Sequence, residues 1–498
     1  MKPKEQKAIQ QAQTLLAQNN VAAAKDALAK YANKNKPGEQ LRFLLSMCMA
    51  ILGELNEARN IALLLIKQNP NNIEYYKLLG SIYHDLRAYD QAITAFESAL
   101  KMNSNDFQTL SNIASSLKEA HRQDEAMTYF KKSLAIQSNQ PDALTNYGLL
   151  LQENVQLDEA IRLHQKALQL APNHMIAMYN LAYTLHEKGD NNAAIQMYNK
   201  LLQSAPNHVK ALCDISYIYN KITQYDKALA HLQHALQFEP ENEYVHLGLG
   251  FTHKKLDNTD AAIASFEEAI RINPNNETAH YYLAIMRGDN SMSRSPDKYV
   301  QELFDGYAET FDNQLVEKLQ YKTPSLINDM VKKHIDVSQQ YNILDLGCGT
   351  GLAGTYLKDI SEHMVGIDLS SKMLKKAGDR NIYDELITTS IDQYFEKHDF
   401  QPHIVVSADV FVYIGDISGI FKDVTKALHK EGIFVFSTED TQEDDEFILK
   451  DSGRFAHNET YISALADTNH LSLIDNQKTI LRYDNNKPIH GRVYLLKK

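Results

Sequence analysis

Small residues recur at a fixed spacing through the first half of the chain. One set of positions holds proline or serine, and a second set, ten positions later, holds a small residue. The two sets are Pro70, Ser104, Ser138, Pro172, Pro206, Pro240 and Pro274, and Gly80, Ala114, Gly148, Ala182, Ser216, Gly250 and Ala284. Their 34-residue spacing is the period of a repeated helix pair, whose two helices need small residues where they approach closely. The pattern predicts an all-α superhelix over residues 1–287.

Alanine keeps the same register in the second helix of each repeat. The alanines are Ala92, Ala126, Ala160, Ala194, Ala228 and Ala262. With this register the first half resembles the tetratricopeptide-repeat family, although Ser104 and Ser138 replace the usual proline and His164 and Leu232 replace an aromatic residue. The resemblance implies a superhelix whose concave inner face receives an extended peptide or a helix of a partner protein.

A polar residue recurs at one position of the first helix in four successive repeats. These residues are Asn112, Asn146, Asn180 and Asp214. A carboxamide can offer both a donor and an acceptor to a peptide backbone, and some peptide-binding members of the family carry an asparagine ladder at this position. We expect these residues to contact a protein or peptide partner. The alternative is that asparagine is simply common there, since Leu78 before the ladder and Gly248 after it do not continue it.

The repeat pattern stops after Arg287, and a different one follows. Residues 288–297 are polar and turn-rich, which is typical of a linker. Residues 298–340 predict two or three helices that form an N-terminal lid, and alternating strands and helices come next. The predicted strands are Asn342–Leu346, His363–Asp368, Leu386–Thr389, His403–Ser407, Gly432–Phe436, Leu471–Tyr483 and His490–Leu496. This order predicts a doubly wound, Rossmann-like α/β domain over residues 298–498 that ends in an antiparallel hairpin.

Composition narrows the class of protein. The 498 residues are 44% hydrophobic and 23% charged, which is ordinary for a soluble globular chain, and the net charge of -12 disfavours binding to nucleic acid. Three isolated cysteines indicate a reducing compartment and no metal site. No apolar run approaches the roughly 18 residues of a membrane span, so we expect a cytoplasmic protein with no membrane contact. The acidic run Thr438–Glu446 predicts a solvated loop.

The sequence ILDLGCGTG covers the first predicted strand of the second half and the turn after it. Three glycines follow Asp345 at G-x-G-x-G spacing, in the strand, turn and helix order in which backbone amides bind a ligand. Leu352 stands where a dinucleotide-binding loop needs its third glycine, which argues against a nicotinamide cofactor. Asp368 ends the next predicted strand, where an acidic side chain can accept hydrogen bonds from ribose hydroxyls.

ILDLGCGTG together with VGIDLS (Val365–Ser370) resembles the S-adenosylmethionine site of class I methyltransferases. The resemblance implies S-adenosylmethionine as cofactor, with the glycine loop against its methionine half and Asp368 on its ribose. The residues implied at the cofactor are Asp345, Gly347, Gly349, Gly351, Asp368, Leu369, Ser390, Ile391, Ala408 and Tyr307. Ser390 departs from the family, which usually has an aspartate there near the adenine amino group. The alternative is a generic doubly wound domain whose glycines merely turn the chain.

Three further segments extend the resemblance to predicted bacterial methyltransferases that carry tetratricopeptide repeats at their N-terminus. They are Tyr307–Pro324, Ser407–Asp416 and Ser452–Ile462. Two absences argue against nucleic acid as the methyl acceptor. Ala408–Phe411 reads ADVF instead of the N/D-P-P-Y-type loop of amino-methylating enzymes, and Cys348, the only cysteine of the domain, lies inside the glycine loop. A protein or a small molecule remains.

The candidate catalytic residues lie in segments that bracket the cofactor in similar folds. Asp409, Tyr413 and His457 are expected to act in catalysis, with His457 as a general base near neutral pH. Arg454 and Tyr461 are expected to contact the acceptor. Structural alternatives stay open: a hydrogen-bonding role for His457, a helix cap for Asp409 and an internal ion pair for Arg454.

The sequence therefore predicts an S-adenosylmethionine-dependent methyltransferase whose repeats recruit a protein acceptor. One alternative is a small-molecule methyltransferase whose repeats serve assembly. Another is a non-catalytic adaptor that only binds S-adenosylmethionine.

Overall fold

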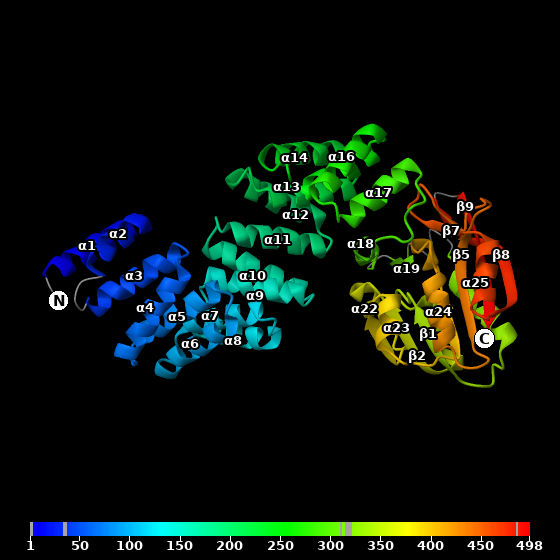
Figure 1. The fold of residues 1–498 in the computed structure, drawn as a ribbon, viewed down its shortest axis with the longest axis horizontal. Helices are drawn as coiled ribbons and strands as arrows, with labels where there is room; N and C mark the ends of the chain where they lie inside the picture. Colours follow the sequence, from blue (N-terminus) through cyan, green and yellow to red (C-terminus); the bar gives the residue numbers. More distant parts are fainter. Residues whose placement is uncertain (1–2, 33–36, 309–310, 314–320, 485–486) are drawn as a thin grey trace. The chain divides into compact units, whose positions relative to one another are not determined.

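A computed structural model describes residues 3–32, 37–308, 311–313, 321–484 and 487–498 (Figure 1). Its contacts divide the chain into two compact units, Met1–Glu239 and Pro240–Lys498. None of the helices in the described ranges combines the length and the apolar character that crossing a membrane requires.

The first unit consists of successive helix pairs. Their bounds are α1 (Pro3–Ala17), α2 (Val21–Ala32), α3 (Glu39–Ile51), α4 (Leu55–Gln68), α5 (Ile73–Asp85), α6 (Tyr89–Met102), α7 (Phe107–Glu119), α8 (Gln123–Ile136), α9 (Pro141–Glu153), α10 (Leu157–Leu170), α11 (Met175–Glu187), α12 (Asn191–Ser204), α13 (Val209–Lys221) and α14 (Tyr225–Phe238). Successive first helices, such as α9 and α11, contact one another more than successive second helices do. The array therefore curves with its first helices on the inner side, and the predicted all-α repeat fold is confirmed.

The recurring small residues are explained by the packing within each pair. A Cβ atom at Gly80 would lie 2.6 Å from the ring of Phe96, and one at Gly148 would lie 2.6 Å from the ring of His164. Real Cβ atoms do not come this close to a neighbour, so each glycine allows a ring of the second helix to sit directly on the first.

His164 occupies the position where Phe96 stands in an earlier repeat. The side chain is fully buried, and neither ring nitrogen has a hydrogen-bond partner among the described residues. Burial, with a smaller contribution from the nearby His174, lowers the pKa of His164 to about 4. The imidazole therefore packs as a neutral ring, at the cost of two unsatisfied polar atoms.

We predict that His164 makes the repeat array sensitive to acid. The unfolded chain binds a proton at His164 near pH 6.5, whereas the folded chain does so only near pH 4, so stability is lost as the pH falls below 6.5. The loss should reach about 2 kcal/mol at pH 5 relative to pH 7.5. Urea unfolding of His164→Phe should show a smaller loss between these two pH values. Phe96→His should gain the same sensitivity, and a His164→Phe protein with the wild-type pH dependence would contradict the assignment.

The second unit contains further helix pairs and then an α/β domain. Its helices are α15 (Glu243–Lys255), α16 (Thr259–Ile272), α17 (Glu277–Arg287), α18 (Asp297–Tyr307), α19 (Phe311–Asn313), α20 (Thr323–His334), α21 (Leu352–Leu357), η2 (Lys358–Ile360), α22 (Ser371–Asp379), α23 (Ile391–Lys397), η3 (Phe411–Tyr413), α24 (Ser418–Ala427) and α25 (Glu459–Thr468). Its strands are β1 (Tyr341–Leu346), β2 (Ser361–Asp368), β3 (Glu385–Thr388), β4 (Ile404–Ser407), β5 (Ile433–Asp440), β6 (Phe447–Leu449), β7 (Phe455–His457), β8 (Ser472–Asp484) and β9 (Lys487–Lys497). Residues 309–310 and 314–320 of the expected lid lie outside the described residues.

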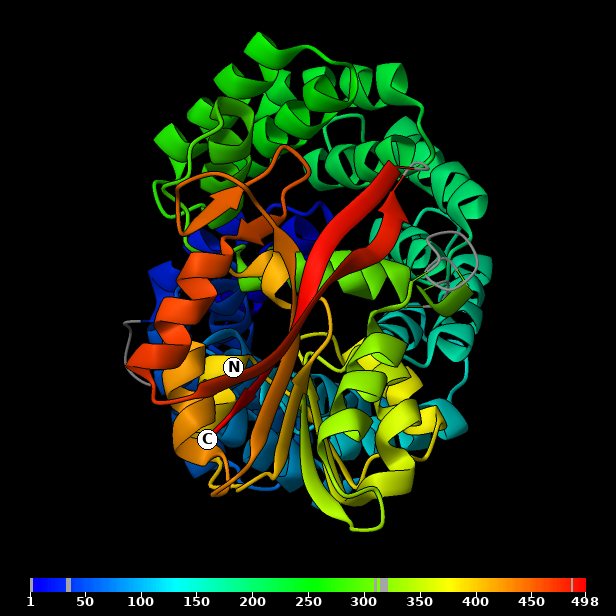
Figure 2. The ribbon, with the colours of Figure 1, turned by 90° about the vertical axis from the view of Figure 1, so that its right-hand side faces the viewer.

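The strands form one sheet in the order β3-β2-β1-β4-β5-β7-β6, with β9 antiparallel between β5 and β8 (Figure 2). The pairs from β3 to β5 are parallel. Alternate residues point to opposite faces: Leu344 and Phe434 pack with α23, α24 and α25, whereas Ile343 and Ile433 pack with α20 and α21. The predicted doubly wound fold and its terminal antiparallel hairpin are confirmed.

The acidic run Thr438–Glu446 is not simply a solvated loop, as its composition suggested. β5 continues to Asp440, and both Thr438 and Glu439 are buried. Glu439 can be buried because its carboxylate pairs with Arg482 and Lys450. Composition alone could not predict this burial, because the partners of Glu439 lie outside the acidic run.

The expected linker, residues 288–297, is bonded to the α/β domain instead of running free. The carbonyl of Ser293 accepts hydrogen bonds from the amides of Gly415 and Asp416, and the amide of Ser295 donates to the carbonyl of Tyr413 at 2.8 Å. Asn290 accepts a bond from the amide of Leu449. The segment is therefore held along the loop after β4, with one isolated antiparallel bridge between Arg294 and Ile414.

The last repeat helix, α17, also belongs to the core of the second unit. Tyr281 is fully buried beside Leu449 and Phe455. Its hydroxyl donates to the carbonyl of Gly453 and accepts a bond from Ser295 Oγ at 3.0 Å. Packing thus places a division at Glu239/Pro240, whereas the sequence period continues to residue 287.

We predict that Tyr281→Phe destabilises the second unit by about 1 to 3 kcal/mol, because it leaves the buried carbonyl of Gly453 without its donor. Thermal unfolding of the full chain should show a lower midpoint for the transition of this unit. Tyr244→Phe is the matched control, since the Tyr244 side chain is 59% exposed and should leave the midpoint unchanged. Equal midpoints for Tyr281→Phe and the wild type would contradict the role of this bond.

Candidate active site

The candidate site lies at the carboxyl edge of the parallel strands. Strand β1 lies between β2 and β4: the chain passes from β1 to β2 and β3 on one side, and then crosses back from β3 to β4 on the other side. At such a point of reversed strand order the loops separate and leave a crevice for a ligand. The loop after β1, the end of β2 and the loop after β4 all meet there.

The loop after β1 is shaped by three glycines with positive φ. The φ angles are 67° at Gly347, 55° at Gly349 and 85° at Gly351. A Cβ at Gly347 would lie 2.4 Å from Val410, so this glycine permits the loop after β4 to approach. Among the described residues, a Cβ at Gly349 would meet only Phe311, at 3.9 Å. Gly349 therefore presents its backbone where a ligand can come close.

Asp368 joins this loop to the end of β2. Its carboxylate accepts bonds from the amides of Gly349 at 2.9 Å and Ser370 at 2.8 Å. The side chain is only half-buried, so it keeps lone pairs for a further donor. Burial raises the pKa of Asp368 to about 6, and the two amide bonds oppose that shift. The carboxylate is thus ionised at neutral pH and can accept bonds from hydroxyl groups.

Asp345 lies at the base of the same crevice and is 1% exposed. Its Oδ2 accepts a bond from the Tyr383 hydroxyl at 2.7 Å, whereas Oδ1 has no partner among the described residues. Burial, opposed by the Tyr383 bond and assisted by the charge of Asp368, raises the pKa of Asp345 to about 7. An unsatisfied buried oxygen is costly, so it indicates a place for a ligand donor.

The remaining residues expected at the cofactor divide into two groups. Ser390 lies beside Asp368, since the amide of Thr389 donates to the carbonyl of Asp368, but the Ser390 hydroxyl caps α23 through the amide of Gln393. Leu369 packs with Tyr413. Ile391 and Ala408 pack in the two cores on either side of the sheet, and Tyr307 is 44% exposed at the end of α18.

Asp409, in the loop after β4, belongs to a buried cluster of ion pairs. It has a φ of 56° directly after β4 and accepts bonds from Arg482 Nη1 at 2.6 Å and Ser437 Oγ at 2.8 Å. Arg482 is 4% exposed and also pairs with Glu439. The Asp409 carboxylate is therefore held by its neighbours and does not have the exposure of a free base or of a simple helix cap.

His457 and Tyr461 lie together beside the loop that follows Tyr413. His457 is fully buried, and its Nε2 lies 3.0 Å from the carbonyl oxygens of both Ile414 and Gly415. Burial lowers the pKa of His457 to about 4. The Tyr461 hydroxyl donates to Asp416 at 3.1 Å. This geometry favours the structural alternative for His457, because its proton bonds the main chain of the loop that contains Tyr413.

Tyr413 and Arg454 both lie near the last repeat helix, α17. Tyr413 is 9% exposed and lies against Phe304 with an edge-to-face ring contact of 5.4 Å. Arg454 precedes β7, and its charge acts on Tyr281 and Tyr299 near α17. Tyr413 acts on the same two tyrosines, so the structure places Tyr413 and Arg454 near each other at this end of the domain.

The polar ladder of the repeats has mixed environments. Asn146 Nδ2 lies 3.5 Å from Ser115 Oγ, and Asn112 is half-buried. Asn180 is 7% exposed, and its Nδ2 has no partner in the described part of the chain. Asp214 accepts bonds from the hydroxyls of Tyr179 and Tyr198.

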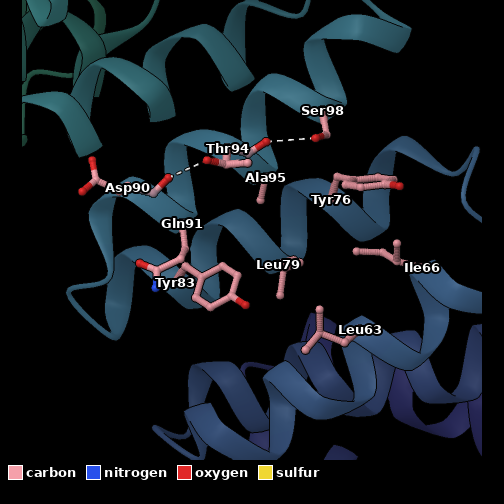
Figure 3. Close-up of a pocket in the computed structure, with 10 residues that line it drawn as sticks. All are labelled: Leu63, Ile66, Tyr76, Leu79, Tyr83, Asp90, Gln91, Thr94, Ala95 and Ser98. Carbon is pink, nitrogen blue, oxygen red and sulfur yellow. Dashed lines mark hydrogen bonds between the residues drawn. The ribbon is translucent and has the colours of Figure 1, made fainter.

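A cavity of about 420 Å³ lies in the first unit between α4, α5 and α6 (Figure 3). Leu63, Ile66 and Leu79 point toward it, with Tyr76 and Tyr83 beside them. All of its lining residues belong to the repeats, so it is distinct from the crevice of the α/β domain. No group of histidine, cysteine or acidic side chains suited to a metal ion occurs within the ranges that the structure covers.

Comparison with known families agrees with both halves. Residues 337–485 match a methyltransferase domain. Residues 73–106, 139–207 and 223–285 match tetratricopeptide repeats. The chain combines tetratricopeptide repeats with a methyltransferase domain.

Curated relatives match parts of this methyltransferase domain. An 18S rRNA (guanine-N(7))-methyltransferase of Bos taurus is 43% identical over 68 residues, which are 13% of this chain and 24% of that protein. A malonyl-acyl-carrier protein O-methyltransferase of Acetivibrio thermocellus is 27% identical over 147 residues, 28% of this chain and 49% of that protein. The matches span about a quarter and about half of these relatives. Their names give different acceptors, so they agree only on methyl transfer.

Solved structures resemble the chain over the repeats. A Cut9–Hcn1 hetero-tetramer of the APC/C is 16% identical, with a TM-score of 0.43 over 55% of this chain and 54% of that chain. Pseudomonas aeruginosa pilF is 20% identical, with a TM-score of 0.39 over 43% of this chain and 96% of that chain. At these TM-scores neither structure bears on function.

Sequence reasoning missed two groups of residues at the site. Arg482 stands in an apolar strand sequence, ILRY, where a single arginine could have been noticed as a buried charge. Asp312 and Arg380, which contact the glycine loop through Thr350, carry no local signal because each lies among other charged residues.

Proposed function

We propose that this chain is an S-adenosylmethionine-dependent methyltransferase with a protein acceptor. The observation that carries the proposal is the carboxylate of Asp368, half-buried at the end of β2 and bonded to the amide of Gly349 in the glycine loop. A cofactor with a ribose and an ammonium group fits this arrangement, since Asp368 offers acceptor lone pairs and Asp345 has a buried oxygen to which no described residue donates.

Each residue has a defined task in this proposal. Asp368 accepts hydrogen bonds from ribose hydroxyls, and Gly349 lets the backbone approach the cofactor without a side chain between them. Asp345 Oδ1 accepts a bond from the ammonium group. The cofactor would supply a methyl group that is already activated by its sulfonium. The protein therefore mainly has to align the acceptor and exclude water.

A general base is not required from His457, whose Nε2 bonds main-chain carbonyls. Tyr413 lies at the crevice edge, and Asp409 is fixed there by Arg482. We infer that both shape the acceptor pocket. An acceptor that is neutral at the pH of the reaction needs no stronger base, because its own lone pair attacks the methyl group.

The repeats supply the reason to propose a protein acceptor. Tetratricopeptide arrays use the inner face of their first helices to receive peptides, and here that face carries Asn112, Asn146 and Asn180. A partner held on the array meets the methyltransferase domain of the same chain at a high effective concentration. A small-molecule acceptor would give the array no such part in the reaction.

We predict that Asp368 controls cofactor affinity and its pH dependence. Because the ionised carboxylate accepts the ribose bonds, affinity for S-adenosylhomocysteine should fall by up to about tenfold per pH unit below pH 6. Asp368→Asn should bind about 10- to 150-fold more weakly at pH 7.5, since a bond to a charged group contributes about 1.5 to 3 kcal/mol. Titration calorimetry measures both. Asp359→Asn is the control, and unchanged affinity in Asp368→Asn would show that the ribose lies elsewhere.

We predict that the full chain transfers labelled methyl from S-adenosylmethionine to a protein in a cell lysate. Replacing Asn112, Asn146 and Asn180 together by alanine should raise the KM for that protein by roughly tenfold or more, with kcat and cofactor affinity unchanged, because only recruitment is lost.

The control replaces three exposed residues on second helices, Gln165, Gln196 and Gln233, by alanine and should leave the KM unchanged. Label that appears only in the small-molecule fraction would replace the protein acceptor by a small one. Binding of S-adenosylmethionine without any transfer would favour the adaptor alternative.

A further inference from the structure

Helix α19 is attached to the glycine loop by charged side chains that have no part in the proposed cofactor contacts. Asp312 of α19 accepts a bond from Thr350 Oγ1 at 2.5 Å and pairs with Arg380 Nη2. Arg380 in turn donates from Nε to the carbonyl of Thr350 at 2.6 Å. One guanidinium thus binds both the glycine loop and the helix that lies over it.

The arginine also packs against the loop with its stem. A Cβ at Gly351 would lie 3.3 Å from Arg380 Cδ, so the methylene groups cover this end of the loop. In the part of the chain that the structure describes, Phe311, next to Asp312, is the one residue close to the Cβ direction of Gly349. Fixing Asp312 therefore also fixes the ring of Phe311 over the backbone that is expected to receive the cofactor.

Two further contacts connect this segment to the rest of the crevice. Asp305 of α18 accepts a bond from Ser370 Oγ, two residues after Asp368. Phe304 lies edge-on to both Phe311 and Tyr413, with ring centroids 5.8 and 5.4 Å away. Helices α18 and α19 therefore touch the glycine loop, the end of β2 and the acceptor side together.

We propose that Asp312, Thr350 and Arg380 form a latch that holds α19 against the glycine loop and sets the rate at which the cofactor leaves. The proposal rests on the proposed function, since it assumes that the glycine loop binds S-adenosylmethionine. Arg380 is a positioning residue in this account: it acts on the cofactor through Asp312 and the loop.

The partial exposure of the pair suits a latch that opens in each cycle. The side chains of Arg380 and Asp312 are 28% and 41% exposed, so water can replace each partner when the pair separates. A fully buried pair such as Arg482–Glu439 would instead resist opening, because separation would leave buried charges without partners.

Stopped-flow displacement of S-adenosylhomocysteine from the full chain tests the latch. Asp312→Asn and Arg380→Gln should each raise the dissociation rate by about 3- to 10-fold, with little change in the association rate, as expected for loss of a partly exposed ion pair. Arg380→Lys should fall between them and the wild type, because it keeps the charge but lacks the Nε donor. The matched control is Lys332→Gln, which removes the surface pair with Asp359.

Equal dissociation rates in the wild type, Asp312→Asn and Arg380→Gln would overturn the latch and leave the proposed function standing. If the wild type binds no S-adenosylhomocysteine, the proposed function fails, and hydrogen exchange then tests the latch without ligand. Amides of α18 should exchange faster in Asp312→Asn than in the wild type, and identical exchange would overturn the latch. Unchanged thermal midpoints would establish that the variants remain folded.

Discussion

The hydrogen bond from the amide of Gly349 to the carboxylate of Asp368 is the contact on which the site depends. It connects the turn after β1 to the end of β2, two places that the parallel pairing of these strands brings to the same edge. The bond requires a positive φ at Gly349, which glycine adopts without strain. Because one carboxylate orders the loop and still offers lone pairs, the loop would need little rearrangement to bind the proposed cofactor.

The parts of the fold that could be predicted are those with a period or a local signal. The 34-residue spacing gave the repeats, since each small residue such as Gly80 faces a ring one helix away. Apolar runs gave β1 to β5, because both faces of a parallel sheet are buried, and also gave the antiparallel pair β8 and β9. The short strands β6 and β7 were missed, since three residues are too few to establish an alternation.

For single side chains of the candidate site, too, only features with a local signal in the sequence could be predicted. The positive φ angles of the glycine motif and the position of Asp368 at the end of β2 could be predicted, because both follow from local backbone geometry. The environment of His457 could not be predicted, since an imidazole is a base in water but a neutral hydrogen-bond donor where burial lowers its pKa to about 4. Asp409 depends likewise on Arg482, which lies 73 residues away in sequence. Contacts of this kind appear only once the sheet has formed.

Helix α17 and the segment after it are bonded to the loops of the α/β domain. The bond of Tyr281 to Gly453 and the bonds of Ser293 to the loop after β4 tie this helix to the segment that carries Tyr413. His457 bonds the carbonyls of that same loop from the other side. The loop is thus held between the last repeat helix and β7. These bonds do not involve Gly349 in the loop after β1 or Asp368 at the end of β2. In the second unit, the segment that follows the last repeat helix is therefore bonded directly to the loop after Tyr413.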